Sequence, residues 1–384
     1  MEDERHIEND RVDRRRFLGR AAAGAAAGSL VACGGVGEGG PAVVTHPNVQ
    51  WRLASSFPPS LDAIYGAAER LADRVEAITE GRFRIHPYAS GEIVPGLQVM
   101  DAAQQGTVQV GHTASYYYVG KNPVLAFDTG MPFGLTGRQQ QAWLYEGGGL
   151  DLVNEVFADF NIIAFPAGNT GAQMGGWFKR EVNSVSELRG LKMRIPSLGG
   201  EVMSRMGVTV QVLAAGDIYP ALERGAIDAT EWVGPYDDEK LGFHKAARFY
   251  YYPGWWEPGP NLSFMVNRAA WDALPASYQE AFRTAAVWAA NGTQTIYDAR
   301  NPAALQRLVA DGVQLRPFST EIMQAARETA VAIMQQNAAA AADYRKVFDA
   351  WDKFREESFR WFSTAEKLYE DFVYGPGTGM QSRP

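Results

Sequence analysis

The chain has 384 residues, of which 46% are hydrophobic, 21% charged and 12% aromatic, and its formal net charge is −8 at pH 7. A chain of this length and composition can bury a large core and is typical of two lobes or domains, which excludes a disordered or fibrous protein. The sequence has no long basic tract, and this argues against nucleic acid as a partner.

Residues 1–33 have the features of an export signal. The pair Arg14 and Arg15 precedes an Ala/Gly-rich stretch, and Leu-Val-Ala then leads to Cys33, the only cysteine of the chain. The uncharged stretch 21–32 is shorter than the roughly 20 residues that span a bilayer. Twin arginines resemble a twin-arginine signal, and Leu-Val-Ala-Cys resembles a bacterial lipobox. We expect the mature protein to begin at a lipid-modified Cys33 outside the cytoplasmic membrane; the alternative is a chance arginine cluster with an incidental thiol.

Residues 34–48 are expected to form a flexible linker, after which strands alternate with helices. Gly35, Gly37 and Gly40 match the dinucleotide pattern G-x-G-x-x-G, but no strand precedes them, so the match carries no function. Ser60 is the expected N-cap of the first helix. The alternation predicts an α/β fold. The expected strands of this half are 49–55, 82–88 and 107–113, and the expected helices are 60–81 and 96–106.

The second half continues the alternation and ends in helices. The segments 90–95 and 105–113 resemble 215–220 and 224–232, which places His112 and Glu231 at corresponding strand ends. Ligands of open α/β sheets bind beyond the carboxyl ends of strands, so we expect Glu231 at a crevice between two lobes. Later segments are expected as strands at 191–197, 208–213, 226–232 and 261–275, and as helices at 199–207, 218–225, 275–301 and across 320–372.

The expected domain organisation is two discontinuous lobes and a helical end. Lobe I takes 49–165 and about 260–318, and lobe II takes 166–259. Helices over 319–373 carry many aromatic residues, so we expect them to pack on their own chain or on a partner subunit, before a tail at 374–384.

Catalytic patterns are missing from the sequence. The five histidines are scattered, and H-E-x-x-H, G-x-S-x-G and C-x-x-C do not occur. The sequence therefore favours binding over catalysis.

A polar set in the second half points to binding of a carboxylate. Asn169, Gln173 and Trp177 lie in a glycine-rich stretch, and Gly175 with Gly176 would let the backbone approach a ligand. Arg194 follows on an expected strand, and its planar guanidinium suits a carboxylate. A strand-end ion pair for Arg194 and a loop-stabilising role for Gln173 are the alternatives.

The stretches 168–180, 191–196 and 216–260, together with the lipobox, resemble the solute receptor of a tripartite ATP-independent periplasmic (TRAP) transporter, in the branch that binds 2-oxo acids and related small monocarboxylates. The resemblance covers roughly 49–372. It implies a non-enzymatic, two-lobed periplasmic solute-binding fold with an interlobe cleft and a long C-terminal helix.

The resemblance also implies the site. Arg194 would clamp the carboxylate of a pyruvate-like ligand or of lactate, and a sodium or calcium ion on the other side would bridge the ligand to Gln173, Glu231 and Trp232. Such ions prefer oxygen ligands. Asp237 or Asp238 could add a ligand for calcium, the alternative being a solvated helix N-terminus. The further expected ligand contacts are Asn169, Tyr117, Trp232 and Trp256.

The partners implied are the TRAP membrane permease subunits, the membrane through the lipid anchor, and in some members a second copy that exchanges the C-terminal helix. Two other functions stay open at this point. An exported metal-dependent enzyme acting on carboxylates would reveal itself by turnover of pyruvate or lactate. A sensory binding protein for the same ligands would lack neighbouring genes for permease subunits.

Overall fold

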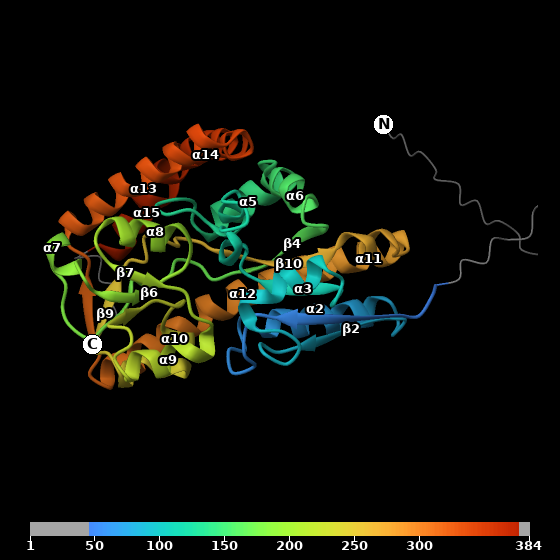
Figure 1. Cartoon of the computed structure of the whole chain (residues 1–384), viewed down its shortest axis with the longest axis horizontal. Helices are drawn as coiled ribbons and strands as arrows, with labels where there is room; N and C mark the ends of the chain where they lie inside the picture. Colours follow the sequence, from blue (N-terminus) through green and yellow to red (C-terminus); the bar gives the residue numbers. More distant parts are fainter. Residues whose placement is uncertain (1–45, 376–384) are drawn as a thin grey trace, which may run out of the picture. The chain divides into compact units, whose positions relative to one another are not determined.

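Two β-sheets organise the computed structural model, which describes residues 46–375 (Figure 1). In the first sheet, β1 pairs in parallel with β2 and β3, and β10 runs antiparallel between β3 and β4. This sheet has the order β2 (Phe83–Tyr88), β1 (Val49–Ser55), β3 (Val110–Thr113), β10 (Asn261–Asn267) and β4 (Ile162–Asn169).

The second sheet is mixed as well. Strands β6, β7 and β8 pair in parallel, whereas β5 runs antiparallel between β8 and β9. Its order is β11 (Gln314–Pro317), β9 (Phe249–Tyr252), β5 (Gly176–Phe178), β8 (Ala229–Thr230), β6 (Lys192–Arg194) and β7 (Thr209–Gln211). Each sheet forms the centre of one lobe, and we call these lobe I and lobe II.

Helices surround each sheet. Those of lobe I are α2 (Gly66–Ile78), α3 (Val99–Gln104), α4 (Leu125–Thr129), α5 (Gly137–Glu146), α6 (Gly149–Ala158) and α11 (Arg268–Asp272), with short 3-10 turns η1 (Gly96–Gln98) and η2 (Ser115–Tyr118). Those of lobe II are α7 (Val185–Leu188), α8 (Ser197–Arg205), α9 (Ala215–Glu223) and α10 (Pro235–Leu241), followed by η3 (Phe243–Lys245).

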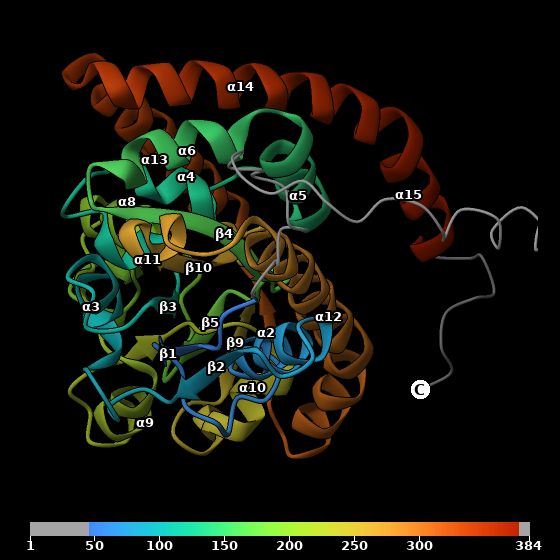
Figure 2. The ribbon, with the colours of Figure 1, turned by 90° about the vertical axis from the view of Figure 1, so that its right-hand side faces the viewer.

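Helix α12 (Ala276–Ala310) connects the two lobes. It packs on α2 and β4 of lobe I and on α10 of lobe II, and Figure 2 shows it beside α2. Its buried face is rich in alanine, including Ala285 and Ala289, which lets neighbouring elements approach closely. The helix extends beyond the expected end at 301.

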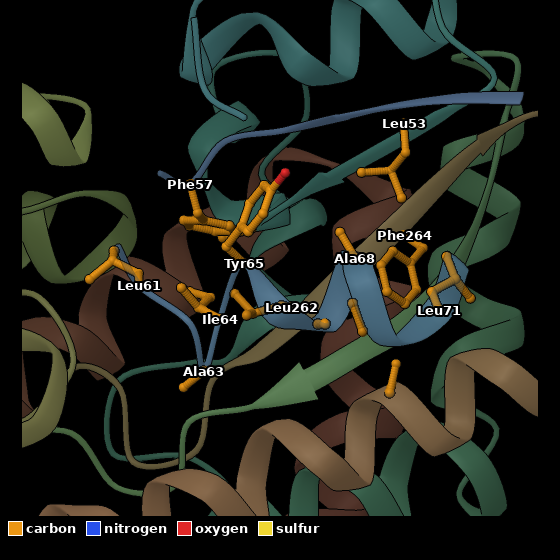
Figure 3. Close-up of a cluster of buried hydrophobic side chains, with 14 of the residues drawn as sticks. Leu53, Phe57, Leu61, Ala63, Ile64, Tyr65, Ala68, Leu71, Leu262 and Phe264 are labelled. Carbon is orange, nitrogen blue, oxygen red and sulfur yellow. The ribbon is translucent and has the colours of Figure 1, made fainter. Parts of the chain in front are cut away.

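The expected helix at 60–81 begins six residues later than predicted. The segment 57–65 forms turns, and α2 starts at Gly66, so Ser60 is not its N-cap. Leu61 and Ile64 of this irregular segment are buried in the same hydrophobic core as Ala68 and Leu71 of α2 (Figure 3). Burial of these two side chains outweighs the local helical pattern.

The helical end packs partly on its own chain. Helices α13 (Thr320–Ala340) and α14 (Ala342–Phe362) pack together, and α14 passes over α5 and α6 (Figure 2). Tyr344 and Trp351 are buried on α14, with ring centroids 5.1 and 5.7 Å from that of Phe127. A π-helical turn, η4 (Ser363–Lys367), then leads to α15 (Leu368–Tyr374).

The observed sheets differ from the expected lobe boundaries in two places. Strand β4 runs through the boundary expected at 165/166, and β11 pairs with β9 in lobe II, although 314–317 was expected in lobe I. The export signal, Cys33 and the linker up to residue 45 lie outside the described residues. Between residues 46 and 375, no helix is long and apolar enough to cross a membrane.

Candidate functional site

Arg194 and Glu231 form a buried ion pair in lobe II. Arg194 ends β6, which pairs in parallel with β8 so that Arg194 lies opposite Thr230, the residue before Glu231. Arg194 Nη1 donates to a carboxylate oxygen of Glu231 and, at 3.2 Å, to the Glu231 carbonyl. The side chains are 1% and 0% exposed. From the sequence we expect them on opposite sides of a ligand, but adjacent strands place them in direct contact.

Of the buried polar atoms that have no hydrogen-bond partner within residues 46–375, three belong to this pair and to Gln173. They are Arg194 Nη2, Glu231 Oε2 and Gln173 Oε1. A buried polar atom without a partner is costly, so such a group of atoms indicates a place where a ligand or ion completes the structure. The donor, Arg194 Nη2, suits an anion, and the two oxygen acceptors of Glu231 and Gln173 suit a cation.

A small cavity of about 10 Å³ lies at the boundary of the two lobes and beside this polar group. The ring centroids of Phe57 from lobe I and Trp232 from lobe II are 6.3 Å apart. The Arg194 guanidinium carbon lies 5.2 Å from the centroid of the Trp232 ring, within range of a cation–π contact. The cavity is lined by Phe57, Ile64, Tyr116, Tyr117, Thr170, Gln173, Trp232, Val233, Pro260 and Leu262.

Glu257 is a site residue that the sequence analysis missed. It is 3% exposed, and it accepts a hydrogen bond at 3.4 Å from the Tyr116 hydroxyl. Its electrostatic neighbours are Glu231, Arg194 and Gln173. The backbone carbonyl of Glu257 also accepts a hydrogen bond from the backbone N–H of Gln173 at 3.2 Å. A single acid in the aromatic, Pro/Gly-rich stretch "PGWWEPGP" was the signal available in the sequence.

The electrostatics of the site reflect burial and charge crowding. Burial raises the pKa of Glu231 to about 7, against the opposing effect of Arg194. Burial and the nearby Glu231 carboxylate raise the pKa of Glu257 well above its usual range. Burial alone would lower the pKa of Arg194, but the Glu231 carboxylate raises it, so the guanidinium stays charged. Two buried acids therefore share one permanent positive charge.

These residues fit a hard cation. Glu231, Glu257 and the Gln173 side-chain oxygen are oxygen ligands of the kind that sodium and calcium prefer. Across residues 46–375, no group of three or more His, Cys, Asp or Glu side chains is placed to hold a metal ion. This candidate set contains only two such side chains, Glu231 and Glu257. Its other ligands would be the Gln173 amide oxygen and a backbone carbonyl such as that of Trp232.

Asn169 and Trp256 are not brought to the cavity. Asn169 Nδ2 donates to the Gly259 carbonyl at 2.8 Å, and its Oδ1 accepts from the Gly171 amide at 2.8 Å, so this side chain fixes the loop that follows Glu257. Trp256 is buried against Trp255, with ring centroids 4.8 Å apart, and packs on Phe318 rather than in the cavity. Tyr117, in contrast, lines the cavity and lies beside Arg194.

The glycines expected to approach a ligand instead approach protein backbone. A Cβ on Gly176, which has φ +84°, would overlap the Thr230 carbonyl, and one on Gly175 would overlap Phe318. Gly176 thus allows tight packing of β5 beside the strand that leads to Glu231, and Gly175 allows close approach to Phe318 and to the Tyr251 backbone of β9.

Asp237 and Asp238 are buried, so the solvated helix N-terminus expected for them is wrong. Asp238 Oδ2 accepts from Trp177 Nε1 at 2.9 Å and from the Tyr250 hydroxyl at 2.7 Å, and its Oδ1 accepts from the Val233 amide at 3.3 Å. Asp237 accepts from the Tyr297 hydroxyl at 2.6 Å. Burial raises the pKa of each to about 7. With its oxygens bonded to protein, Asp238 braces the strands behind Trp232.

His112 is a structural residue of lobe I. It is fully buried, its Nδ1 lies 3.1 Å from Ser55 Oγ, and its ring packs on Phe57 at 5.2 Å. Burial lowers its pKa to about 3. The sequence repeat that paired it with Glu231 holds only in part: each residue follows a helix and a turn, but 90–95 forms turns whereas 215–220 lies in α9.

With fold and site established, comparison with known proteins defines the class. The profile of the family described as "Bacterial extracellular solute-binding protein, family 7" matches residues 54–340, and the chain belongs to this family. It is a periplasmic solute receptor of a TRAP transporter and not an enzyme. The chain is also 56% identical, over 94% of its length and 99% of the relative, to the monocarboxylate 2-oxoacid-binding periplasmic protein of Nostoc sp. (strain PCC 7120).

Solved structures of TRAP solute-binding proteins share the fold. That from Bordetella bronchiseptica RB50, a mixed occupancy dimer with calcium and picolinate in one site, is 45% identical and superposes with a TM-score of 0.84 over 85% of this chain and 98% of that chain. Those from Colwellia psychrerythraea, with calcium and pyruvate, and Pseudoalteromonas atlantica T6c, with sodium and pyruvate, are each 37% identical, with TM-scores of 0.82 over 84% of this chain and 99% of theirs.

Proposed function

We propose that this receptor binds a small 2-oxo or 2-hydroxy monocarboxylate, pyruvate-like or lactate, together with a sodium or calcium ion, and delivers it to the membrane permease subunits. The observation that carries the proposal is the buried group of Arg194 Nη2, Glu231 Oε2 and Gln173 Oε1, none of which has a partner within the described residues. The relatives described with calcium or sodium and pyruvate support the same chemistry.

Arg194 and Tyr117 would hold the ligand carboxylate. Arg194 Nη1 is already committed to Glu231, so Nη2 is the donor available to a second carboxylate. Charge-assisted bonds of this kind are short and strong, and they favour an anion in a site closed to water. The apolar lining, with Phe57, Ile64 and Leu262, suits a short alkyl group on the other end of the ligand.

Gln173, Glu231, Glu257 and the Trp232 carbonyl would hold the cation. The ion supplies positive charge that lets two buried carboxylates and an anionic ligand occupy one site. Burial and then the Glu231 carboxylate raise the pKa of Glu257, so a cation at this place relieves the same repulsion that a proton on Glu257 would. Asn169 and Trp256 act in this scheme from behind the site, by fixing the loop that carries Glu257.

Titration of the purified protein with pyruvate, lactate and longer 2-oxo acids, followed by tryptophan fluorescence, tests this function. The titrations are run in calcium, in sodium, and in sodium-free buffer with a chelator. We expect tight binding with a cation and a large loss of affinity without one. If none of these acids binds in calcium or in sodium, the proposal is overturned. If affinity is equal in all three buffers, the cation has no part in ligand binding.

Export and anchoring complete the proposed cellular role. Arg14 and Arg15 would direct twin-arginine export, and Cys33 would carry the lipid that holds the receptor at the outer face of the cytoplasmic membrane. Mass analysis of the mature N-terminus tests this: we expect a diacylated Cys33 in the membrane fraction, and a Cys33→Ser variant released to the soluble periplasmic fraction. An unmodified Cys33 in the mature wild-type protein would contradict the anchor.

A second copy of the chain is the proposed further partner, through the end of the C-terminal helices. Trp361 and Phe372 are 62% and 74% exposed although both are large and apolar. Side chains of this kind usually mark an interface. The Bordetella bronchiseptica relative, described as a dimer, supports the same proposal.

A further inference from the structure

A cluster of charged side chains joins the two lobes outside the cavity. Asp62 lies in the irregular segment 57–65 of lobe I and is 48% exposed at its side chain. It forms an ion pair with Lys240 of α10 in lobe II, and its Oδ2 lies 2.8 Å from Arg300 Nη1 of α12. The Tyr236 hydroxyl of α10 donates to the same carboxylate at 2.9 Å. One acid of lobe I thus accepts from two side chains of α10 in lobe II and from one side chain of the connecting helix α12.

The aromatic ring of Tyr236 holds the two cations in place. Lys240 Nζ lies 3.7 Å from the centroid of this ring, and the Arg300 guanidinium carbon lies 5.1 Å from it. Cations at these distances are attracted to the face of the ring. The ring therefore orients both cations toward Asp62, and the contact is a network rather than an isolated surface ion pair.

Helices α10 and α12 are tied to each other without Asp62. The Tyr236 amide donates to Asn301 Oδ1 at 3.0 Å, and Arg307 forms a two-pronged pair with Glu239, with N–O distances of 2.8 and 2.6 Å. Helices α10 and α12 are therefore held together by their own contacts, and Asp62 is the member of the cluster that connects segment 57–65 of lobe I to them.

The cluster is close in sequence to both walls of the cavity. Ile64, two residues after Asp62, lines the cavity from lobe I, and Val233, three residues before Tyr236, lines it from lobe II. Figure 3 shows Ile64 on the same irregular segment as Phe57, which also lines the cavity. Asp62 itself is not among the lining residues. Its contacts fix the position of the segment that forms the lobe I wall.

We propose that Asp62 is a positioning residue for ligand binding, which fastens segment 57–65 to α10 and α12 and so keeps the cavity shut around the bound ligand. This inference rests on the proposed function, because the ligand it retains is the monocarboxylate. Contacts between the lobes slow ligand release, whereas entry takes place with the lobes apart. The ligand-free protein samples both arrangements, so these contacts also form part of the time without ligand.

The first arm of the test measures release of pyruvate by stopped-flow fluorescence in calcium. For Asp62→Asn we expect the dissociation rate to rise about five- to tenfold, with an association rate close to that of the wild type. Asp62→Glu keeps the negative charge, so its dissociation rate should be close to that of the wild type. The matched control is Glu239→Gln, which removes an acid from α10 but leaves the lobe I contact intact, and we expect it to release pyruvate like the wild type.

Ionic strength separates this role from a general loss of structure. Exposed ion pairs are screened by salt, so the wild-type dissociation rate should approach that of Asp62→Asn as choline chloride is added at constant calcium. A difference between the two proteins that persists unchanged at high salt would contradict the proposal, as would a dissociation rate in Asp62→Asn equal to that of the wild type.

The second arm needs no ligand and therefore separates the two proposals. Amide hydrogen exchange of the ligand-free protein should be faster in segment 57–65 of Asp62→Asn than in the wild type, and unchanged in Glu239→Gln. Equal exchange in Asp62→Asn and the wild type would overturn the role of Asp62 even if pyruvate binds. If the wild type binds no monocarboxylate but exchange is faster in Asp62→Asn, the proposed ligand is wrong and the contact between Asp62 and the helices α10 and α12 is supported.

Discussion

Arg194 and Glu231 contact each other in the interior of lobe II, where one is 1% and the other 0% exposed. The pair is supported by further bonds from the guanidinium, because Arg194 Nε donates to the Leu213 carbonyl at 3.3 Å and Nη1 to the Glu231 carbonyl. Burial of two charges is costly, and such a pair adds little stability over apolar residues of similar size. Its retention in a receptor cavity is better explained by ligand binding than by folding.

We therefore expect single substitutions in this pair to be far more harmful than their combination. Arg194→Met and Glu231→Met each leave one buried charge without its partner, and each should lower the free energy of unfolding by about 3–5 kcal/mol at pH 8. The double variant should lose much less than the sum of the two. Urea unfolding of the four proteins without ligand measures this coupling, and additive losses would show that the two charges do not depend on each other.

The same double variant separates stability from function. It keeps an apolar, filled interior but has neither the guanidinium for the ligand carboxylate nor the carboxylate for the cation. We expect it to fold and to bind neither pyruvate nor calcium. Retained pyruvate binding by the folded double variant would exclude Arg194 from the site.

Glu257→Gln should move stability and cation binding in opposite directions. Neutralising Glu257 removes the repulsion with Glu231, so the ligand-free protein should melt at a higher temperature in chelator. Loss of one carboxylate ligand should weaken calcium binding by about 10- to 100-fold, and the increase in melting temperature on adding calcium should shrink accordingly. Scanning calorimetry with and without calcium measures both.

The control for this prediction is Glu155→Gln, which neutralises an exposed acid that is paired with Lys346 on the surface. It should change neither the melting temperature in chelator nor the response to calcium. A lower melting temperature of Glu257→Gln in chelator, with an undiminished response to calcium, would place Glu257 outside the cation site and give it a purely structural role.

The sequence predicted this site in part because strand patterns carry local information. Arg194 lies on an expected strand and Glu231 at the end of another, and strands β6 and β8 form at these places in the structure. Their direct contact could not be predicted, since it depends on which strands are neighbours. Glu257 lies in a loop without periodicity, and its approach to Glu231 results from the packing of distant segments.

The segment 57–65 shows the same limit for the fold. Its apolar spacing continues that of α2, and local pattern alone extends the helix back to Ser60. Contacts with residues far along the chain, such as those of Ile64 with the core and of Asp62 with Lys240 and Arg300, hold it in turns instead. Strand β1 has the expected bounds, whereas the strand expected over 261–275 ends at Asn267 and is followed by α11 from Arg268.

Asp128 gives a prediction for the pH dependence of stability. It is buried in lobe I against the hydroxyl groups of Ser115 and Ser263, and burial raises its pKa from 3.8 to about 6. Because the folded pKa lies above the unfolded one, its contribution to stability is fully present below about pH 3.8 and is lost as the pH rises through about 6. The loss amounts to about 3 kcal/mol.

Asp128→Asn removes this loss. The unfolding free energy of the variant minus that of the wild type should rise between about pH 4 and pH 6 and stay constant at higher pH, since other buried acids titrate equally in both proteins. Urea unfolding at several pH values measures the difference. Removal of one hydroxyl donor by Ser263→Ala should shift the rise to higher pH, whereas a pH-independent difference would mean that Asp128 is ionised throughout.

The end of the C-terminal helices gives a prediction for assembly. The first part of α14 is anchored on its own chain by Tyr344 and Trp351, whereas Trp361 of α14 and Leu368 and Phe372 of α15 are exposed. Ending the chain after Phe362 should therefore leave the lobes folded and remove part of the surface that we assign to a second copy. Light scattering after size exclusion should show a dimer for the full chain and a monomer for the shortened one.

The position of the truncation decides whether the result can be interpreted. A deletion that begins at Asp343 would remove Tyr344 and Trp351, which pack on Phe127, and loss of two buried aromatic side chains would unfold this side of lobe I. The double variant Leu368→Ser and Phe372→Ser keeps the full length and should also be monomeric, with a free energy of unfolding within about 0.5 kcal/mol of the wild type, because both side chains are exposed in one copy. A dimer that survives both changes would locate its interface elsewhere on the chain, and pyruvate affinity equal to that of the wild type in the monomeric variants would show that each copy carries a complete site.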